Sequence, residues 1–180
     1  MYLIISATNR ANSNTLKVAN QVAELLQNHT NEPVVLYSLE SFEKSLLDSG
    51  TGLMQFPENL TSFHDEVFLP TKKVIYVMPE YNGGFSGILK LFVDILSTRK
   101  YKENFVGKKA GLIGVATGRA GNLRGMEHFT GVLNYLNTTV FPNRLPISTV
   151  DKVLGHESGF DPDSKNVLDS YLKDFVSWAE

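Results

Sequence analysis

A glycine-rich segment between two apolar runs constrains the fold of this chain more than any other feature. Residues 73–78 (KVIYVM) are typical of a buried strand, and residues 88–96 carry apolar side chains at helical spacing. The segment between them begins with Pro79–Gly84 (PEYNGG), which cannot continue a strand. In an open α/β sheet such a loop lies at the carboxyl end of its strand, where ligands bind. Because Gly83 and Gly84 lack a Cβ atom, a planar ligand can approach this backbone, although an ordinary tight turn has the same composition.

The alternation of strand-like and helical patterns continues along the chain. Apolar runs predict strands at 2–6, 33–38, 73–78, 109–116 and from 138 to 141, the last followed by an irregular passage to about residue 159. Helical patterns cover 15–28, 60–68, 88–96, 123–136 and the segment from Asp161-Pro162 to Trp178. Residues 41–59 have mixed polarity, with glycines and a proline, and predict a long loop. The alternation predicts a parallel sheet with helices on both faces, in a doubly wound topology.

Length and composition limit the class of protein further. The chain has 180 residues, 42% of them hydrophobic and 20% charged, so we expect a single globular domain over residues 1–180. No apolar run approaches the roughly 20 residues of a membrane helix, and residues 1–5 are too short for a signal sequence. The absence of cysteine excludes disulfides and thiol catalysis. A net charge of −2 lacks the excess of basic residues that is typical of nucleic-acid-binding proteins. We expect a cytoplasmic protein.

The loop after the first predicted strand has the composition of a phosphate site. Residues 8–15 (TNRANSNT) combine hydroxyls, amides and one arginine ahead of a helix N-terminus, where backbone N–H groups attract anions. The guanidinium of Arg10 suits a phosphate group. Simple capping by Ser13 or Asn14 is the alternative interpretation. The segment matches neither of the glycine-rich loops that bind nucleotide triphosphates or dinucleotides, which favours the terminal phosphate of a mononucleotide.

A third unusual loop, residues 116–125 (ATGRAGNLRG), follows the fourth predicted strand. Loops after the first, third and fourth strands emerge on one edge of a parallel sheet. One phosphate loop beside two flat glycine loops predicts a site for a phosphorylated planar ring. Flavin mononucleotide (FMN) has that shape, and flavodoxin-like sheets bind it at this edge.

At these residues the chain resembles the NADPH-dependent FMN reductase family, a flavodoxin-like group that includes azoreductases, chromate reductases and quinone reductases. The first loop is similar to the family pattern [GS]-[ST]-x-R-x-x-S-x-[NT], and the second to P-E-Y-N-G-[SG]-x-x-G-x-L-K-x-x-x-D. The third is similar to S-T-G-x-x-G-G-x-R, with Ala116 in place of a frequent serine and Asn122 in place of a frequent glycine. The resemblance implies a flavodoxin-like three-layer sandwich with a five-stranded parallel sheet in the order 2-1-3-4-5.

The resemblance also implies roles for individual residues. It assigns the FMN phosphate to residues of the first loop, namely Thr8, Arg10, Ser13, Asn14 and Thr15. It assigns the ribityl chain and one side of the flavin ring to Pro79, Glu80, Tyr81, Asn82 and Gly83. It assigns the far side of the flavin ring to Thr117 and Gly118.

Several charged residues have more than one interpretation. Glu80 is expected to be structural or to lie at a subunit contact, because a bound flavin carries the redox chemistry itself. Lys90 and Asp94, four residues apart, form either an ion pair on one helix or a contact between subunits. Arg119 and Arg124 are candidates for the 2′-phosphate of NADPH or are solvated loop residues. The four histidines have no metal-ligand spacing, so no metal site is expected.

The family resemblance implies an oxidoreductase that passes hydride from NADPH or NADH through FMN to an acceptor. Free flavin, a quinone, an azo compound or a metal oxyanion are the acceptor classes. The alternative is a flavodoxin-type electron carrier without NADPH turnover of its own, which the near-neutral charge disfavours. Members of the family are commonly homodimers or homotetramers, and we expect the same here.

Overall fold

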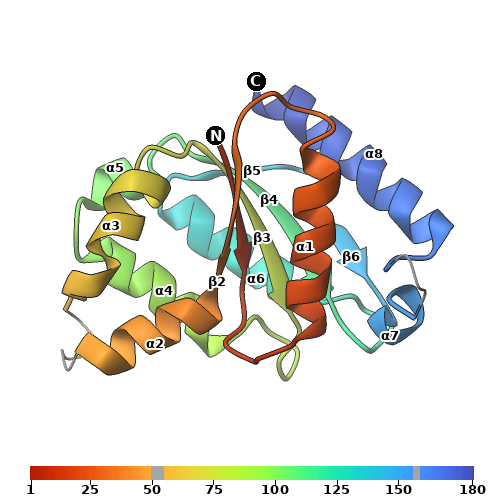
Figure 1. Cartoon of the computed structure of the whole chain (residues 1–180), viewed down its shortest axis with the longest axis horizontal. Coiled ribbons are helices and arrows are strands. Elements are labelled where there is room, and N and C mark those ends of the chain that lie inside the picture. Colours follow the sequence, from red (N-terminus) through yellow and green to blue (C-terminus); the bar gives the residue numbers. More distant parts are fainter. Residues whose placement is uncertain (50–54, 156–158) are drawn as a thin grey trace.

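A parallel sheet forms the centre of the computed structural model, which describes residues 1–49, 55–155 and 159–180 (Figure 1). Its strands are β1 (Tyr2–Ser6), β2 (Val34–Ser38), β3 (Lys73–Pro79), β4 (Lys109–Val115), β5 (Thr139–Val140) and β6 (Leu145–Ile147). They are ordered β2-β1-β3-β4-β5, with β6 also paired to β4, and every pair is parallel. The predicted strand order is therefore confirmed.

The fifth position of the sheet is divided between two short strands. β5 pairs with the start of β4 at Lys109 and Ala110, and β6 pairs with its end from Ile113 to Val115. Pro142 lies between β5 and β6, and a proline cannot donate a ladder hydrogen bond, which accounts for a break there. The apolar run at 138–141 therefore marked only the first half of this edge strand.

Helices cover both faces of the sheet (Figure 1). Side chains alternate along each strand, so Ile4, Ile75 and Ile113 pack toward one face and Leu3, Tyr76 and Leu112 toward the other. The first face is covered by α1 (Asn14–Leu26), α7 (Val150–Val153) and α8 (Pro162–Ala179). The second face is covered by α2 (Leu39–Ser49), η1 (Glu58–Leu60), α3 (Thr61–Phe63), η2 (His64–Phe68), α4 (Gly87–Ser97), α5 (Tyr101–Phe105) and α6 (Leu123–Tyr135).

Three α-helices differ from the sequence prediction. The loop predicted over residues 41–59 is wrong in its first part, because α2 extends from Leu39 to Ser49; residues 50–54 lie outside the described residues. Phe42 on α2 is fully buried and packs edge-on against Phe92 of α4, with ring centroids 5.1 Å apart, so tertiary packing stabilises a weakly patterned helix. The short helices α5 and α7 were not predicted. Among the described residues, no helix is both long enough and apolar enough to cross a bilayer.

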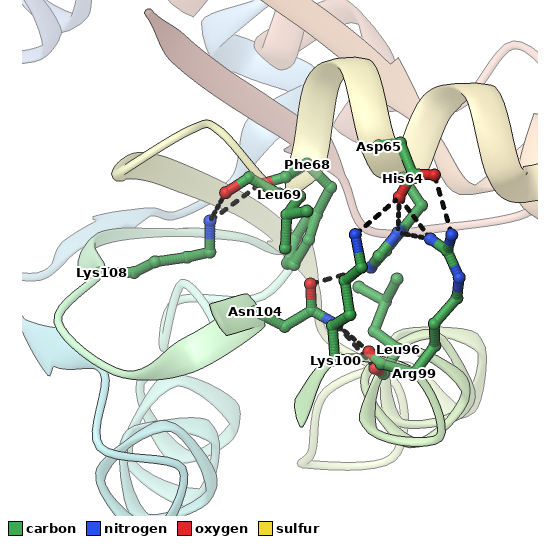
Figure 2. Close-up of polar contacts among 9 residues, drawn as sticks. All are labelled: His64, Asp65, Phe68, Leu69, Leu96, Arg99, Lys100, Asn104 and Lys108. Atoms are coloured by element: carbon green, nitrogen blue, oxygen red, sulfur yellow. Dashed lines mark hydrogen bonds and ion pairs between the residues drawn. The ribbon is translucent and has the colours of Figure 1, made fainter. Parts of the chain in front are cut away.

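A group of polar side chains, here called the polar cluster (His64, Asp65, Arg99, Asn104 and Lys108), joins η2, α4 and α5 at the amino ends of β3 and β4 (Figure 2). The fully buried His64 places Nε2 2.9 Å from Oδ1 of Asn104 and Nδ1 2.8 Å from Oδ1 of Asp65. The Asn104 amide donates in turn to the carbonyls of Leu96 and Arg99, at 2.7 and 2.6 Å.

Two cations complete the polar cluster. The guanidinium of Arg99 binds both carboxylate oxygens of Asp65, with Nη2 2.8 Å from Oδ2, and these hydrogen bonds hold the pKa of that carboxyl well below its usual range. Lys108 is buried, and its ammonium donates to the carbonyls of Phe68, Leu69 and Thr71 at the end of η2. Burial lowers the pKa of Lys108 to about 7.

Candidate functional site

The loops after β1, β3 and β4 surround a cleft of about 430 Å³ at the carboxyl edge of the sheet, the lower edge in Figure 1. The predicted residues that line the cleft are Arg10, Ser13, Asn14, Thr15, Pro79, Glu80, Tyr81, Thr117 and Gly118. Thr8, Asn82 and Gly83 were also predicted, and they are not among the residues that line it. The structure thus brings the three sequence motifs together in one hollow.

The first loop places the N-terminus of α1 at the cleft. Oγ of Ser13 caps the helix by accepting from the backbone N–H of Leu16 at 3.0 Å, while Ser13, Asn14 and Thr15 also line the hollow. Ser13 therefore both caps α1 and lines the cleft. Backbone N–H groups in the first turn have no intrahelical acceptor, and the helix dipole adds partial positive charge there. With Arg10 beside them, these groups form a donor set suited to one phosphate.

Thr8 lies beneath the cleft wall and joins the first loop to the second. Its buried Oγ1 is 2.6 Å from the hydroxyl of Tyr81 and accepts from the backbone N–H of Arg10 at 3.2 Å. The guanidinium carbon of Arg10 stands 4.5 Å from the centre of the Tyr81 ring, within range of a cation–π contact. Thr8 thus orients Tyr81 and Arg10, both of which face the cleft.

The second loop is a two-residue hairpin turn. Tyr81 and Gly84 exchange backbone hydrogen bonds of 2.9 and 3.0 Å, and the residues between them, Asn82 and Gly83, have φ of 52° and 78°. Positive φ at both central positions is the property of a type I′ turn, which strongly favours an Asn-Gly pair. Asn82 and Gly83 therefore shape the loop, while Pro79, Glu80 and Tyr81 form its cleft wall.

Four lining residues were missed by the sequence analysis, namely Ala11, Val115, Ala116 and Val150. The two alanines lie inside sequence motifs in which the polar residues, and not the alanines, were taken as site candidates. Val150 starts α7, and it reaches the cleft because its N–H donates to the carbonyl of Ala116 at 3.0 Å. No local signal marks that contact, since Val150 lies within the passage of the sequence that was predicted to be irregular. Among the described residues, no group of three or more His, Asp or Glu side chains could hold a metal ion.

Comparison with known proteins identifies the family. The sequence profile described as NADPH-dependent FMN reductase matches residues 2–151. The chain belongs to that family. It is 26% identical over 121 residues to an NAD(P)H-dependent FMN reductase of Pseudomonas aeruginosa, a match that covers 67% of this chain and 61% of the relative. It is 24% identical over 126 residues to a 2-hydroxy-1,4-benzoquinone reductase of a Burkholderia species, covering 69% of this chain and 68% of the relative.

A solved structure has the same fold over nearly the whole length. The flavoenzyme NAD(P)H:(acceptor) oxidoreductase of Paracoccus denitrificans superimposes with a TM-score of 0.74 at 19% identity, covering 99% of this chain and 95% of that one. At that identity the likeness establishes the fold, which is flavodoxin-like. FMN is the cofactor of the family and NADPH its reductant.

The cleft has the chemical features that FMN requires. One end offers the α1 N-terminus and Arg10 to a single phosphate, without the glycine-rich loop that a pyrophosphate needs. Pro79 of the second loop and Gly118 of the third loop also line the cleft, and the lack of a Cβ atom on Gly118 allows a flat ring to approach its backbone. The donor set and the lining residues of the cleft therefore both fit this cofactor.

Proposed function

We propose that the chain is an FMN-dependent NAD(P)H oxidoreductase that reduces a small-molecule acceptor. The observation that carries this proposal is the convergence of a helix N-terminus, Arg10 and two glycine-containing loops on one cleft at the carboxyl edge of the sheet. Free flavin, a quinone, an azo compound or a metal oxyanion could serve as acceptor. The Burkholderia relative, by its name, reduces a benzoquinone, which supports testing quinones first.

Different residues around the cleft would bind the phosphate and the ring of FMN. The phosphate would be held by Arg10, Ser13, Asn14 and Thr15 together with the first-turn N–H groups of α1. Pro79, Glu80 and Tyr81 would support one side of the ring, with Asn82 and Gly83 forming the turn that presents them, and Thr117 and Gly118 would support the other side. Thr8 would hold Tyr81 and Arg10 in place through its contacts with both.

Bound FMN supplies the hydride chemistry, and the protein contributes orientation, exclusion of water and electrostatic tuning. Tyr81 is fixed by the Thr8 hydroxyl and covered by Arg10, so it presents an ordered wall to a ring in the cleft. Arg119 and Arg124 lie exposed on the third loop and at the start of α6, where they could contact the 2′-phosphate of NADPH.

Steady-state kinetics test this proposal against the electron-carrier alternative. Purified protein supplied with FMN, NADPH and a benzoquinone should oxidise NADPH continuously. Because reductant and acceptor would use the same cleft in turn, varying both should give parallel double-reciprocal lines. Intersecting lines would show that both bind together, and FMN binding without NADPH turnover would identify a carrier.

We also propose a homodimer or homotetramer, as the family resemblance implies. The exposed Tyr135, at 81% of its free surface, lies beside a hollow between α4, α5 and α6 that Val93 and Leu136 line. Lys90 and Asp94 on this face pair with each other, with Nζ 2.7 and 2.8 Å from the carboxylate oxygens. Light scattering after size-exclusion chromatography should give at least twice the 20.0 kDa mass of the chain, and a monomer would refute the proposal.

A further inference from the structure

One buried amide connects the second and third loops behind the cleft. Asn122 lies at the start of α6, is only 1% exposed and has φ of 64°, in the left-handed region. Its Nδ2 donates to the backbone carbonyls of Met78 at 3.1 Å and Pro79 at 2.8 Å. These are the last carbonyls of β3, and Glu80 and the hairpin turn follow directly. A single side chain from the third loop therefore holds the chain at the point where the second loop begins.

The orientation of this amide differs from that of an ordinary helix cap. An asparagine at this position normally accepts a hydrogen bond from the first turn of its own helix. Within the described residues, Asn122 makes no such bond to α6, and its Oδ1 is buried without a partner. An unpartnered buried acceptor is costly. The side chain thus binds the second loop and does not cap its own helix. A glycine at this position would have no buried acceptor without a partner.

The surroundings leave room for this amide and little more. A Cβ atom on Gly125 would stand 2.1 Å from Oδ1 of Asn122 and 2.8 Å from the carbonyl carbon of Gly84. A Cβ atom on Gly114 of β4 would stand 3.0 Å from the Cβ of Asn122. Glycines on α6 and β4 therefore allow the amide and the second loop to pack closely. The contact belongs to a tightly fitted junction of three elements.

We propose that Asn122 is a positioning residue that fixes the spacing between the two loops on either side of the flavin ring. Its side chain holds Pro79 of the second loop, and its backbone belongs to the third loop, in which Thr117 and Gly118 line the opposite side of the cleft. The inference rests on the proposed function, since it assumes that these two walls hold FMN. Asn122 stands where the family often has glycine, so the amide adds a constraint that glycine would not provide.

The test is Asn122→Gly, which keeps the left-handed backbone accessible and removes both donated hydrogen bonds. Apo-protein titrated with FMN should bind about tenfold more weakly, as expected for the loss of roughly one to two neutral hydrogen bonds. The visible spectrum of bound FMN should also change, because the walls around the ring move. Neither readout depends on turnover.

Two control variants separate positioning from general stability. Asn137→Gly makes the same exchange at an exposed left-handed asparagine beyond the other end of α6 and should leave FMN binding unchanged. Thr138→Val removes a buried hydrogen bond to the carbonyl of Phe105, 2.9 Å long, near the start of β5 at the amino edge of the sheet. It should lower the melting temperature without changing FMN affinity.

Asn122→Asp provides a conservative variant that can restore the contact. A carboxyl group facing two buried carbonyls is held protonated and keeps one donor, so this variant should bind FMN more tightly than Asn122→Gly. The advantage should disappear as rising pH ionises the carboxyl. The quantity to follow with pH is the ratio of the FMN dissociation constants of Asn122→Asp and Asn122→Gly. Titration of the FMN phosphate affects both constants equally and cancels in this ratio.

Each outcome has a distinct meaning. If the wild-type protein binds no FMN, the proposed function is wrong and the inference falls with it. If the wild type binds FMN and Asn122→Gly binds it equally well, with an unchanged spectrum and only a lower melting temperature, Asn122 is structural and the inference alone is overturned. If Asn122→Gly does not fold, Asn122→Asp is compared with the wild type instead. Tighter FMN binding by Asn122→Asp than by the wild type at any pH would contradict the positioning role. An FMN affinity of Asn122→Asp that does not change with pH relative to the wild type would also contradict it.

Discussion

The two edges of the sheet use polar side chains in opposite ways. At the amino edge, the members of the polar cluster contact one another or backbone carbonyls, and Arg99 is paired with Asp65. At the carboxyl edge, Arg10 makes no ion pair with any described carboxylate and stacks on Tyr81 instead. A satisfied set of polar groups stabilises a fold, whereas donors aimed at an open cleft are free to bind a ligand. The comparison predicts that equivalent substitutions at the two edges will have different consequences.

The largest difference should come from two glycines with nearly the same backbone conformation. Gly83 in the second loop and Gly107 before β4 have φ of 78° and 76°, and a Cβ atom at either would meet no described atom within 4 Å. A β-branched residue is strained at such φ, so Gly83→Val and Gly107→Val should lose comparable stability. Only Gly83→Val should abolish FMN binding and NADPH turnover, because it denies the second loop its turn.

Circular dichroism and calorimetric titration with FMN would check this pair. A folded Gly83→Val that retains full turnover would show that the second loop is a simple turn. Loss of FMN binding in Gly107→Val would show that strain anywhere in the fold damages the site.

The next difference compares two arginines. Arg10→Ala removes a charge-assisted hydrogen bond to phosphate, worth roughly 1.5–3 kcal/mol, so FMN affinity should fall about tenfold to a hundredfold. Arg99→Ala should reduce the free energy of unfolding, because it leaves Asp65 without its main partner, and should leave FMN affinity unchanged. Fluorescence titration with FMN and urea denaturation measure the two effects. Equal FMN affinity in Arg10→Ala and the wild type would remove Arg10 from the site.

A smaller effect concerns acid stability. The pKa of Asp65 is lowered in the folded state, so its contribution to stability is present above the unfolded pKa of about 3.9 and is lost as pH falls toward the folded value. Asp65→Asn should therefore lower stability at neutral pH and flatten the decline of stability below about pH 4. Urea midpoints measured across acid pH for both proteins test this. Parallel curves would mean that the Asp65 carboxylate contributes nothing to acid sensitivity.

The smallest effect on FMN binding is expected at Lys108, whose pKa burial lowers to about 7. Between that value and an unfolded pKa of about 10.4 the unfolded state binds more protons, so this residue makes stability rise with pH over that interval. Lys108→Met should remove that rise while leaving FMN affinity unchanged. Denaturation midpoints from neutral to alkaline pH check it, and an unchanged slope in the variant would refute the assigned shift.

The sequence predicted the carboxyl edge far better than the amino edge. The first, third and fourth strands and the motifs that follow them were readable because each joins an apolar run to a dense local pattern of glycines and polar residues. Asn82 and Gly83 were assigned to the site by motif, and in the structure their left-handed backbone forms the turn of the second loop. Asn122 was noted only as a departure from the family pattern, since its partners lie more than 40 residues away.

The amino edge carried no comparable pattern. His64 and Asp65 come from η2, Arg99 from the turn after α4 and Asn104 from α5, and each looks like a solvated residue in its own segment. The helix α2 was missed for a related reason, because Phe42 gains its stabilising contact from α4 rather than from a neighbour in the sequence. Contacts between distant elements were therefore the part that local patterns could not predict.

The central claim is that the cleft at the carboxyl edge binds a flavin with a single phosphate. Apo-protein titrated separately with FMN and with FAD by calorimetry tests it most directly. One helix N-terminus with Arg10 should accept the monoester of FMN with the higher affinity, and Arg10→Ala should reduce the preference. Tighter binding of FAD than FMN, or a preference that survives Arg10→Ala unchanged, would contradict the account.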